Sequence, residues 1–159
     1  MVNVDSLAYN PESMNAQERA RFEIRPTPGR GKGLFAKIPL RKGEFVIEYT
    51  GTPLPTEVAD KMSNRYLFDM ENGTTIDGTP LSNTARWINH SCDPNCEAFI
   101  EDGKIMIYAC RNIAATDELT FDYGQEYFDE FLGPHGCLCN AKKHRTFSGA
   151  ADKKASGEH

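Results

Sequence analysis

Residues 86–96 read RWINHSCDPNC, and the interpretation of the whole chain starts from them. The stretch contains the only tryptophan, two of the five cysteines and one of the four histidines. Asp93-Pro94 is a turn signal, because the residue before a proline avoids the helical region of backbone space. A polar, turn-rich segment that directly follows apolar Trp87 and Ile88 is partly buried, and its polar groups need hydrogen bonds. Such an arrangement is costly, so the stretch indicates a functional site.

Length and composition favour one intracellular globular domain. The chain has 159 residues, with a hydrophobic fraction of 39% and a charged fraction of 26%. No apolar run approaches the roughly 20 residues that span a bilayer. The first residues lack the basic start and apolar core of a secretory signal, so we expect no membrane partner. The five cysteines then favour metal binding or catalysis over disulfides.

The net charge of −5 argues against direct nucleic-acid binding, because nucleic-acid-binding proteins carry basic surfaces. An acidic chain suits a basic peptide substrate. Many intracellular proteins are acidic without having such a partner, so the charge by itself leaves both interpretations open.

Alternating apolar residues and frequent turn signals predict a β-rich domain. Strands are expected over residues 22–25, 34–38, 44–49, 65–70, 74–76, 98–101, 104–110 and 118–123, and helices over 16–21, 56–63 and 125–132. The glycine-rich residues 29–33 are expected to form a loop, and Thr56 is a candidate N-cap. Asn72-Gly73 and Asp102-Gly103 are expected to close hairpins. The predicted organisation is a polar arm over 1–20, a domain over 21–124, a segment over 125–147 and a disordered tail over 148–159.

Four further motifs accompany residues 86–96. They are GRGKGLFA at residues 29–36, EYTG at 48–51, ELTFDYG at 118–124 and CLC at 137–139. In this order the motifs resemble those of the SET-domain protein lysine methyltransferases, and the resemblance extends from about residue 22 to residue 145. It implies a mostly β fold, the SET-domain (β-clip) fold of several small curved sheets with few short helices. It also implies a C-terminal pseudoknot between the Asn-His-Ser-Cys and Phe-Asp-Tyr segments, followed by a post-SET-like segment over 125–147.

The glycine loop is the first part of a predicted donor site. Gly31-Lys32-Gly33 allows a close approach of the backbone to a ligand, and clustered amides can hold a carboxylate. Alone, the loop would be a plain tight turn, and no Ser or Thr follows Lys32 as in a phosphate-binding loop. The resemblance implies that the loop holds the methionine part of S-adenosylmethionine. It implies further that Asn89 and His90 hold the amino group and adenine, and that Tyr66 lies at the same pocket.

Methyl transfer to lysine requires the neutral amine. Free lysine has a pKa of about 10.4, so deprotonation at pH 7 costs roughly 4.6 kcal/mol. An apolar channel beside a sulfonium cation lowers this cost through desolvation and charge repulsion. The resemblance implies that Tyr123 and Tyr49 are the catalytic tyrosines and that Phe121 lines the lysine channel. A phenylalanine leaves room for a larger amine, which predicts products beyond monomethyl-lysine. Without the other motifs, Tyr123 and Phe121 would be ordinary residues of a strand end.

The C-terminal cysteines resemble the post-SET zinc motif of the family, with His144 at the position of its third cysteine. A tetrahedral site of three cysteines and one histidine is acceptable to zinc. The predicted metal ligands are Cys92, Cys137, Cys139 and His144. Cys96 or His135 could replace the third ligand, and a metal-free tail is the alternative. A cysteine hydrolase that uses Cys92 with His90 is disfavoured, because no separate group is available to orient the histidine.

Together these features predict an S-adenosylmethionine-dependent protein-lysine N-methyltransferase that acts on a histone or another basic protein. The rival from a different class is a non-catalytic SET module that binds a protein partner. All four of the residues that a degenerate module often lacks are present, and this favours the enzyme. They are Tyr49, Asn89, His90 and Tyr123.

Overall fold

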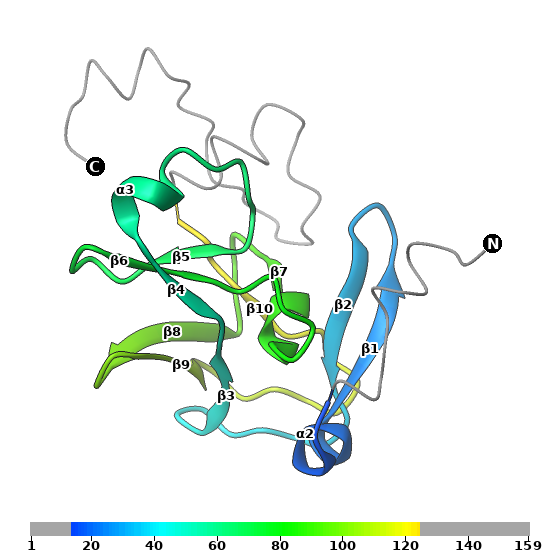
Figure 1. Ribbon diagram of the computed structural model, residues 1–159. Coiled ribbons are helices and arrows are strands. Elements are labelled where there is room, and N and C mark those ends of the chain that lie inside the picture. The colour runs from blue at the N-terminus through cyan, green and yellow to red at the C-terminus, as the bar shows by residue number, and fades with distance from the viewer. Residues whose placement is uncertain (1–13, 125–159) are drawn as a thin grey trace.

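The structure is a computed structural model, and it describes residues 14–124. The described chain forms ten short strands and three short helices (Figure 1). The helices are α2 (Ala16–Arg21), α3 (Thr56–Ala59) and the 3-10 helix η2 (Thr84–Trp87). The strands are β1 (Phe22–Thr27), β2 (Gly31–Ala36), β3 (Phe45–Tyr49), β4 (Thr52–Pro55), β5 (Leu67–Asp69), β6 (Thr74–Asp77), β7 (Asn89–His90), β8 (Cys96–Glu101), β9 (Lys104–Ala109) and β10 (Thr120–Phe121). None of these helices is long and apolar enough to cross a bilayer.

The strands form four small sheets rather than one large one. Their orders are β1-β2, β3-β9-β8, β4-β6-β5 and β10-β7. All pairs are antiparallel except β7 with β10, which run parallel. In Figure 1, β7 and β10 lie in the middle of the molecule with the other sheets around them. The predicted mostly β fold of several small sheets with few short helices is confirmed.

Two predicted hairpins are confirmed, and both depend on their turn residues. Asp102 and Gly103 adopt positive φ angles of 50° and 75° between β8 and β9, as a two-residue hairpin turn requires. Gly73 has a φ of 90° between β5 and β6. The predicted helix over residues 16–21 also forms, because Asn15 and Glu18 make a reciprocal capping box at its start.

The loop within the glycine-rich run is shorter than predicted. The loop expected over residues 29–33 ends at Arg30, and Gly31 to Gly33 belong to β2, where Gly33 pairs with Arg25. A Cβ atom on Gly33 would lie 2.6 Å from Glu118 Oε2. Glycine within a strand often marks such a close approach. Gly33 therefore allows β2 to pack closely against Glu118.

Two further expectations about elements were wrong. Strand β4 was not expected; it is an edge strand, where the missing N–H groups of Pro53 and Pro55 are tolerated. The helix expected over 56–63 ends at Ala59. Its N-cap is Pro55 without a side-chain hydrogen bond, and the Thr56 hydroxyl instead bonds to the Thr75 hydroxyl at 2.9 Å.

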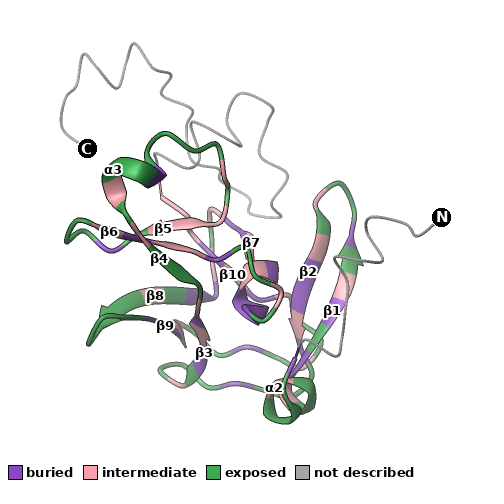
Figure 2. Ribbon diagram, in the orientation of Figure 1, coloured by how far each residue is buried: buried purple, intermediate pink, exposed green. Residues whose placement is uncertain are grey.

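One continuous core holds the sheets together (Figure 2). Ile105 and Ile107 fill it from β9, and Leu34 fills it from β2. Ile88 and Leu119 are also completely buried, and they lie just before β7 and β10. Burial of each such side chain contributes about 1.5–3 kcal/mol. The two segments that carry the predicted site residues are therefore anchored in the core directly beside those residues.

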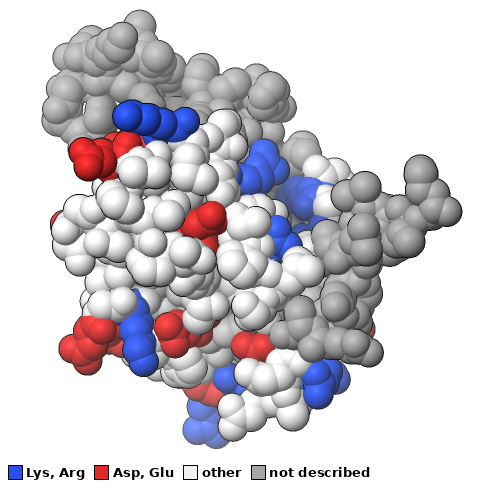
Figure 3. Space-filling model, in the orientation of Figure 1, with Lys and Arg blue, Asp and Glu red and all other residues white. Residues whose placement is uncertain are grey.

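Charges of both signs lie close together on the face of the molecule shown in Figure 3. Ion pairs on the surface include Arg111 with Asp93 at 3.2 Å and Arg21 with Glu44 at 3.3 Å. Exposed pairs of this kind contribute little to stability. The core, rather than the surface charges, therefore accounts for most of the stability of the fold.

Candidate functional site

Strands β7 and β10 bring two distant motifs together. Asn89 lies opposite Thr120, and His90 lies opposite Phe121. The Ser91 amide extends the pairing by donating to the Phe121 carbonyl at 3.2 Å. The polar stretch that the sequence singles out therefore lies directly beside the Phe-Asp-Tyr segment, as the resemblance implies.

Asn95, in the turn that follows β7, stabilises this arrangement through its side-chain hydrogen bonds. Its Nδ2 donates to the Glu118 carbonyl at 2.8 Å, and its Oδ1 accepts from the Thr120 amide at 2.9 Å. Its side chain is nearly buried. Buried amides of this kind are costly unless they are hydrogen-bonded. Asn95 thus satisfies backbone groups of the segment that leads into β10.

The start of β2 is tied to the start of β7 by a second asparagine. Asn89 Nδ2 donates to the Lys32 carbonyl at 3.1 Å and to Glu118 Oε2 at 2.9 Å. Arg30 holds the same carboxylate with two bonds, Nη1 to Oε2 at 3.1 Å and Nη2 to Oε1 at 2.9 Å. The structure therefore brings the predicted donor-site residues Lys32, Gly33 and Asn89 together beside Glu118, and Gly31 precedes them in β2.

His90 is oriented by the backbone of the neighbouring segment. Its Nδ1 accepts a hydrogen bond from the Tyr123 amide at 3.1 Å, so the ring proton is assigned to Nε2. Nε2 lies 3.4 Å from the Cys92 sulfur. Asp122 Oδ1 also lies 3.8 Å from the same Nδ1. With its proton on Nε2, His90 donates towards the Cys92 sulfur, an arrangement that does not favour His90 as the base that activates Cys92.

The predicted channel residues of β10 and its extension lie against each other. The rings of Phe121 and Tyr123 have centroids 4.6 Å apart, and the His90 ring meets Tyr123 edge to face at 5.6 Å. Phe121 is buried, and the Tyr123 hydroxyl donates to the Ile88 carbonyl. The structure thus places the predicted donor-site residue His90 next to the predicted channel residue Tyr123.

Tyr49 and Tyr66 form a second group. The Tyr49 hydroxyl donates to the Tyr66 carbonyl at 2.8 Å, and a Cβ atom on Gly78 would lie 2.5 Å from that hydroxyl oxygen. The Arg86 guanidinium lies over the Tyr66 ring at 4.4 Å and over the Trp87 ring at 4.8 Å. Arg86 therefore connects this group to the segment that enters β7.

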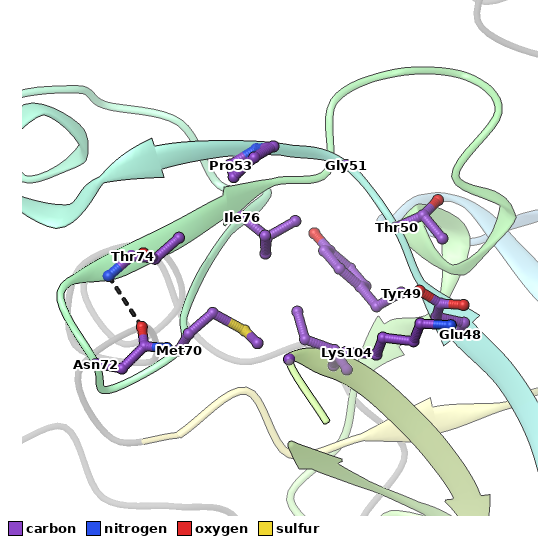
Figure 4. A pocket seen from close by; sticks show the side chains of 12 residues that line it. Glu48, Tyr49, Thr50, Gly51, Pro53, Met70, Asn72, Thr74, Ile76 and Lys104 are labelled. Carbon is purple, nitrogen blue, oxygen red and sulfur yellow. Dashed lines mark hydrogen bonds between the residues drawn. The ribbon is translucent and has the colours of Figure 1, made fainter. Parts of the chain in front are cut away.

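A cavity of about 340 Å³ opens beside Tyr49 (Figure 4). Figure 4 shows the Tyr49 ring on one side, with Ile76 and Met70 facing it and Lys104 at the rim. Neither Tyr123 nor Phe121 lines this cavity. It is therefore a groove between two sheets that shares one residue with the predicted lysine channel, and it is not that channel.

The predicted zinc site reaches beyond the described chain. Cys92 lies within it and is partly exposed, whereas Cys137, Cys139 and His144 lie outside the described residues. Among residues 14–124, no group of three histidine, cysteine or acidic side chains is placed to hold a metal ion. Zinc with these ligands stays a prediction, as do the predicted segments over 125–147 and 148–159.

Sequence reasoning missed three residues of the site, namely Arg30, Glu118 and Asn95. Glu118 begins the ELTFDYG motif, but no role was assigned to it. Arg30 stands between two glycines in a segment expected to be a loop, where a charged side chain is usually exposed. Its ion pair joins residues that are distant in sequence, so no local pattern indicates it.

Comparison with known proteins agrees with this geometry. The family described as "SET domain" matches residues 31–124, which is more than half of the chain. The chain belongs to the SET-domain family.

Three relatives show where in this family the similarity lies. Histone-lysine N-methyltransferase ATX2 of Arabidopsis thaliana is 35% identical over 90% of this chain and 14% of its own length. The histone-lysine N-methyltransferases named H3 lysine-4 specific from Eremothecium gossypii and Saccharomyces cerevisiae are each 41% identical over 72% of this chain, and over 13% and 12% of their own lengths. The chain thus spans only about one seventh or less of these relatives.

Family membership implies S-adenosylmethionine as methyl donor, and the residues present are compatible with it. Gly31 has a φ of 70°, and nothing lies within 4 Å of the position that a Cβ atom would take. The backbone at this point is therefore open to a ligand. The nearby Glu118 carboxylate is paired with Arg30, so its negative charge is compensated.

Proposed function

We propose that the chain is an S-adenosylmethionine-dependent protein-lysine N-methyltransferase. The observation that carries this proposal is the parallel pairing of β7 with β10, which sets Asn89 and His90 beside Phe121 and Tyr123. Methyl transfer needs donor and acceptor in line, and such alignment is worth about 7–11 kcal/mol of the barrier. A pair of adjacent strands, one carrying the donor residues and one carrying the channel residues, supports this alignment.

The hydrogen bonds of the two tyrosines support this proposal. Each hydroxyl donates its proton to a backbone carbonyl, Tyr123 to Ile88 and Tyr49 to Tyr66. A tyrosine oxygen also has lone pairs that accept hydrogen bonds. These oxygens can hold an amine N–H and make weak contacts with the C–H groups of a methyl. The side chains thus orient the lysine nitrogen, and they do not need to act as bases.

Burial lowers the cost of using a neutral lysine. Phe121 is only 6% exposed, and its ring packs against Tyr123. An ammonium group beside such rings loses hydration, so its pKa falls. S-adenosylmethionine, when bound, supplies the electrophilic methyl group. The phenylalanine at position 121 supports a product that goes beyond monomethyl-lysine.

The substrate proposed is a lysine in a histone. The relatives are named histone-lysine N-methyltransferases, two of them H3 lysine-4 specific. The net charge of −5 suits a basic protein of this kind. We also propose a zinc ion bound by Cys92, Cys137, Cys139 and His144, in an intracellular setting where thiols stay reduced.

The decisive experiment is methyl transfer from labelled S-adenosylmethionine to a panel of histones and other basic proteins. We expect labelling of a histone by the wild-type chain and its near-complete loss in Tyr123→Phe. Donor binding, measured by calorimetry on both proteins, controls for folding of the site. Donor binding without labelling would mean that the substrate is missing from the panel, whereas neither labelling nor donor binding would favour the non-catalytic module that binds a partner.

A further inference from the structure

The sheet β3-β9-β8 has one buried face and one outward face. Side chains alternate along each strand, so neighbouring residues point to opposite sides. Ile105, Ile107 and Ala109 of β9 are buried, whereas the residues between them are turned outward. The outward residues of the three strands form what we call the outer sheet face. Its members are Phe45, Glu48, Glu97, Phe99, Glu101, Lys104, Met106 and Tyr108.

Half of the outer sheet face is apolar. Phe45 is 40% exposed and Phe99 is 45% exposed. The Tyr108 ring lies between them, 5.8 Å from each ring centroid and edge to face with both. Met106 lies directly opposite Phe99 in the ladder. The solvent face of an antiparallel sheet is normally polar, and contiguous exposed apolar side chains indicate an interaction site.

The polar members of this face are mainly acidic. Glu97 lies opposite Tyr108, Glu48 lies opposite Met106, and Glu101 accepts a hydrogen bond from the Tyr108 hydroxyl at 2.5 Å. Lys104 is the single basic member of the outer sheet face. In Figure 3, acidic and basic side chains lie at the lower left, where Figure 1 places the tip of the β8–β9 hairpin. Aromatic rings framed by carboxylates attract cations, guanidinium groups above all.

We propose that the outer sheet face docks a short segment of a partner protein that combines arginine or lysine with apolar residues. The face carries three carboxylates and one ammonium group, so it favours a basic segment. Apolar contacts come from the other four members, Phe45, Phe99, Met106 and Tyr108. The face is turned away from the core, and Glu48 and Lys104 at one end of it also border the cavity beside Tyr49. The proposal does not depend on methyl transfer.

The size and charge of the face argue against a second copy of this chain. With strands about 4.8 Å apart and about 3.4 Å per residue, three short strands cover on the order of 200 Å². A stable dimer buries about 800 Å² on each partner. Two copies would also bring their carboxylates together, which is repulsive. A single extended segment matches both the area and the charge.

The test uses the full chain and three fluorescein-labelled peptides of equal length: alternating arginine and leucine, alternating arginine and serine, and alternating glutamate and leucine. We expect the arginine–leucine peptide to bind more tightly than the other two by fluorescence anisotropy. Reversal of charge on the outer sheet face, Glu97→Lys with Glu101→Lys, should weaken this binding about tenfold or more. Phe45→Ser with Phe99→Ser should weaken it similarly.

Matched controls separate the face from the overall charge and apolarity of the chain. Glu57→Lys with Glu71→Lys makes the same change in net charge at exposed positions elsewhere, and Ile38→Ser with Met62→Ser removes exposed apolar side chains elsewhere. Both control pairs should leave binding within about twofold of wild type. All variants replace exposed residues, and circular dichroism checks that each one is folded.

Three results would overturn the proposal. The first is equal weakening by the face reversal and the control reversal, which would indicate attraction by net charge alone. The second is no binding of the arginine–leucine peptide by the wild-type chain. The third is a dimer in sedimentation equilibrium that Phe99→Ser dissociates, which would assign the face to self-association.

Discussion

Arg30 shows how one side chain can position the glycine-rich segment. Its ion pair with Glu118 has side-chain exposures of 14% and 13%, so neither charge is well solvated. Breaking such a pair leaves an uncompensated charge in a poorly hydrated place, which is more costly than losing a surface pair. Glu118 also fixes the Asn89 amide, which in turn holds the Lys32 carbonyl. The guanidinium thus acts on the predicted donor site through two other side chains.

Arg30→Gln is therefore expected to weaken binding of S-adenosylmethionine about tenfold, equivalent to about 1.4 kcal/mol. Arg30→Lys should restore only part of the affinity, because an ammonium group cannot make the paired bonds of a guanidinium. Isothermal calorimetry on the folded proteins measures the effect. Arg111→Gln is the control, since its pair with Asp93 has side-chain exposures of 50% and 68%. Unchanged affinity in folded Arg30→Gln would show that the pair does not position the loop.

Phe121 carries the prediction about the product. Its ring is nearly buried and its centroid lies 4.6 Å from that of Tyr123, so a hydroxyl added to it enters a confined place. We expect wild-type protein to form di- or trimethyl-lysine and Phe121→Tyr to stop mainly at monomethyl-lysine. Mass spectrometry after exhaustive reaction separates the products. Monomethyl-lysine as the sole wild-type product would refute this role of Phe121.

At the scale of elements, the sequence predicts those helices and strands that are specified by local patterns of residues. The β8–β9 hairpin, the helix at residues 16–21 and the strand β3 follow from alternation, turn residues and capping. Strand β4 could not be predicted locally, because its prolines are tolerated only once it is known to lie at an edge. Strand β10 lies within the strand predicted over 118–123, whereas β7 has two residues, which is too short for any periodicity. The pairing of β7 with β10 was expected only from family resemblance.

The same limit applies to the site. Asn89, His90, Phe121 and Tyr123 could be placed together because their motifs resemble those of the family. The roles of Arg30 and Glu118 depend on one particular long-range contact. A single sequence does not predict such contacts, because the residue type at one position does not specify which distant residue it will contact.

Strand β8 contains a buried thiol that should make the sheet sensitive to alkali. Burial, with a smaller effect of nearby Cys110, raises the pKa of Cys96 from 9.0 to about 12. The folded state thus keeps the proton more tightly than the unfolded state. The associated stability is complete below pH 9, and it is lost as the pH rises from there towards 12.

We therefore expect the free energy of unfolding to fall between about pH 8 and about pH 10, and to fall less in Cys96→Ala. Urea denaturation under reducing conditions at both pH values measures the difference. Cys110→Ala is the comparison, because Cys110 is partly exposed and should leave most of the pH dependence in place. Equal pH dependence in wild type and Cys96→Ala would assign the loss to other groups.

At the scale of the whole molecule, the site forms where the chain closes on itself. The β1–β2 and β8–β9 hairpins join residues that are near in sequence, whereas β7 and β10 are separated by the whole β8–β9 hairpin. Contacts between distant residues require loop-closure entropy before any stabilisation is gained. We infer that the hairpins are formed in the folding transition state and that the β7–β10 pairing follows.

Asn95 tests this order, because its side chain secures the segment that leads into β10, whereas only its backbone carbonyl bonds to the β8–β9 hairpin, at the Cys110 amide. Asn95→Ala removes the bonds to the Glu118 carbonyl and the Thr120 amide and should cost about 2–3 kcal/mol. We expect the loss to appear almost entirely as faster unfolding in stopped-flow measurements. Ile107→Val in central strand β9 should cost about 0.5–1.5 kcal/mol and slow folding instead. If Asn95→Ala slows folding by most of its equilibrium loss, the closure that creates the site already exists in the transition state, and the site forms together with the fold.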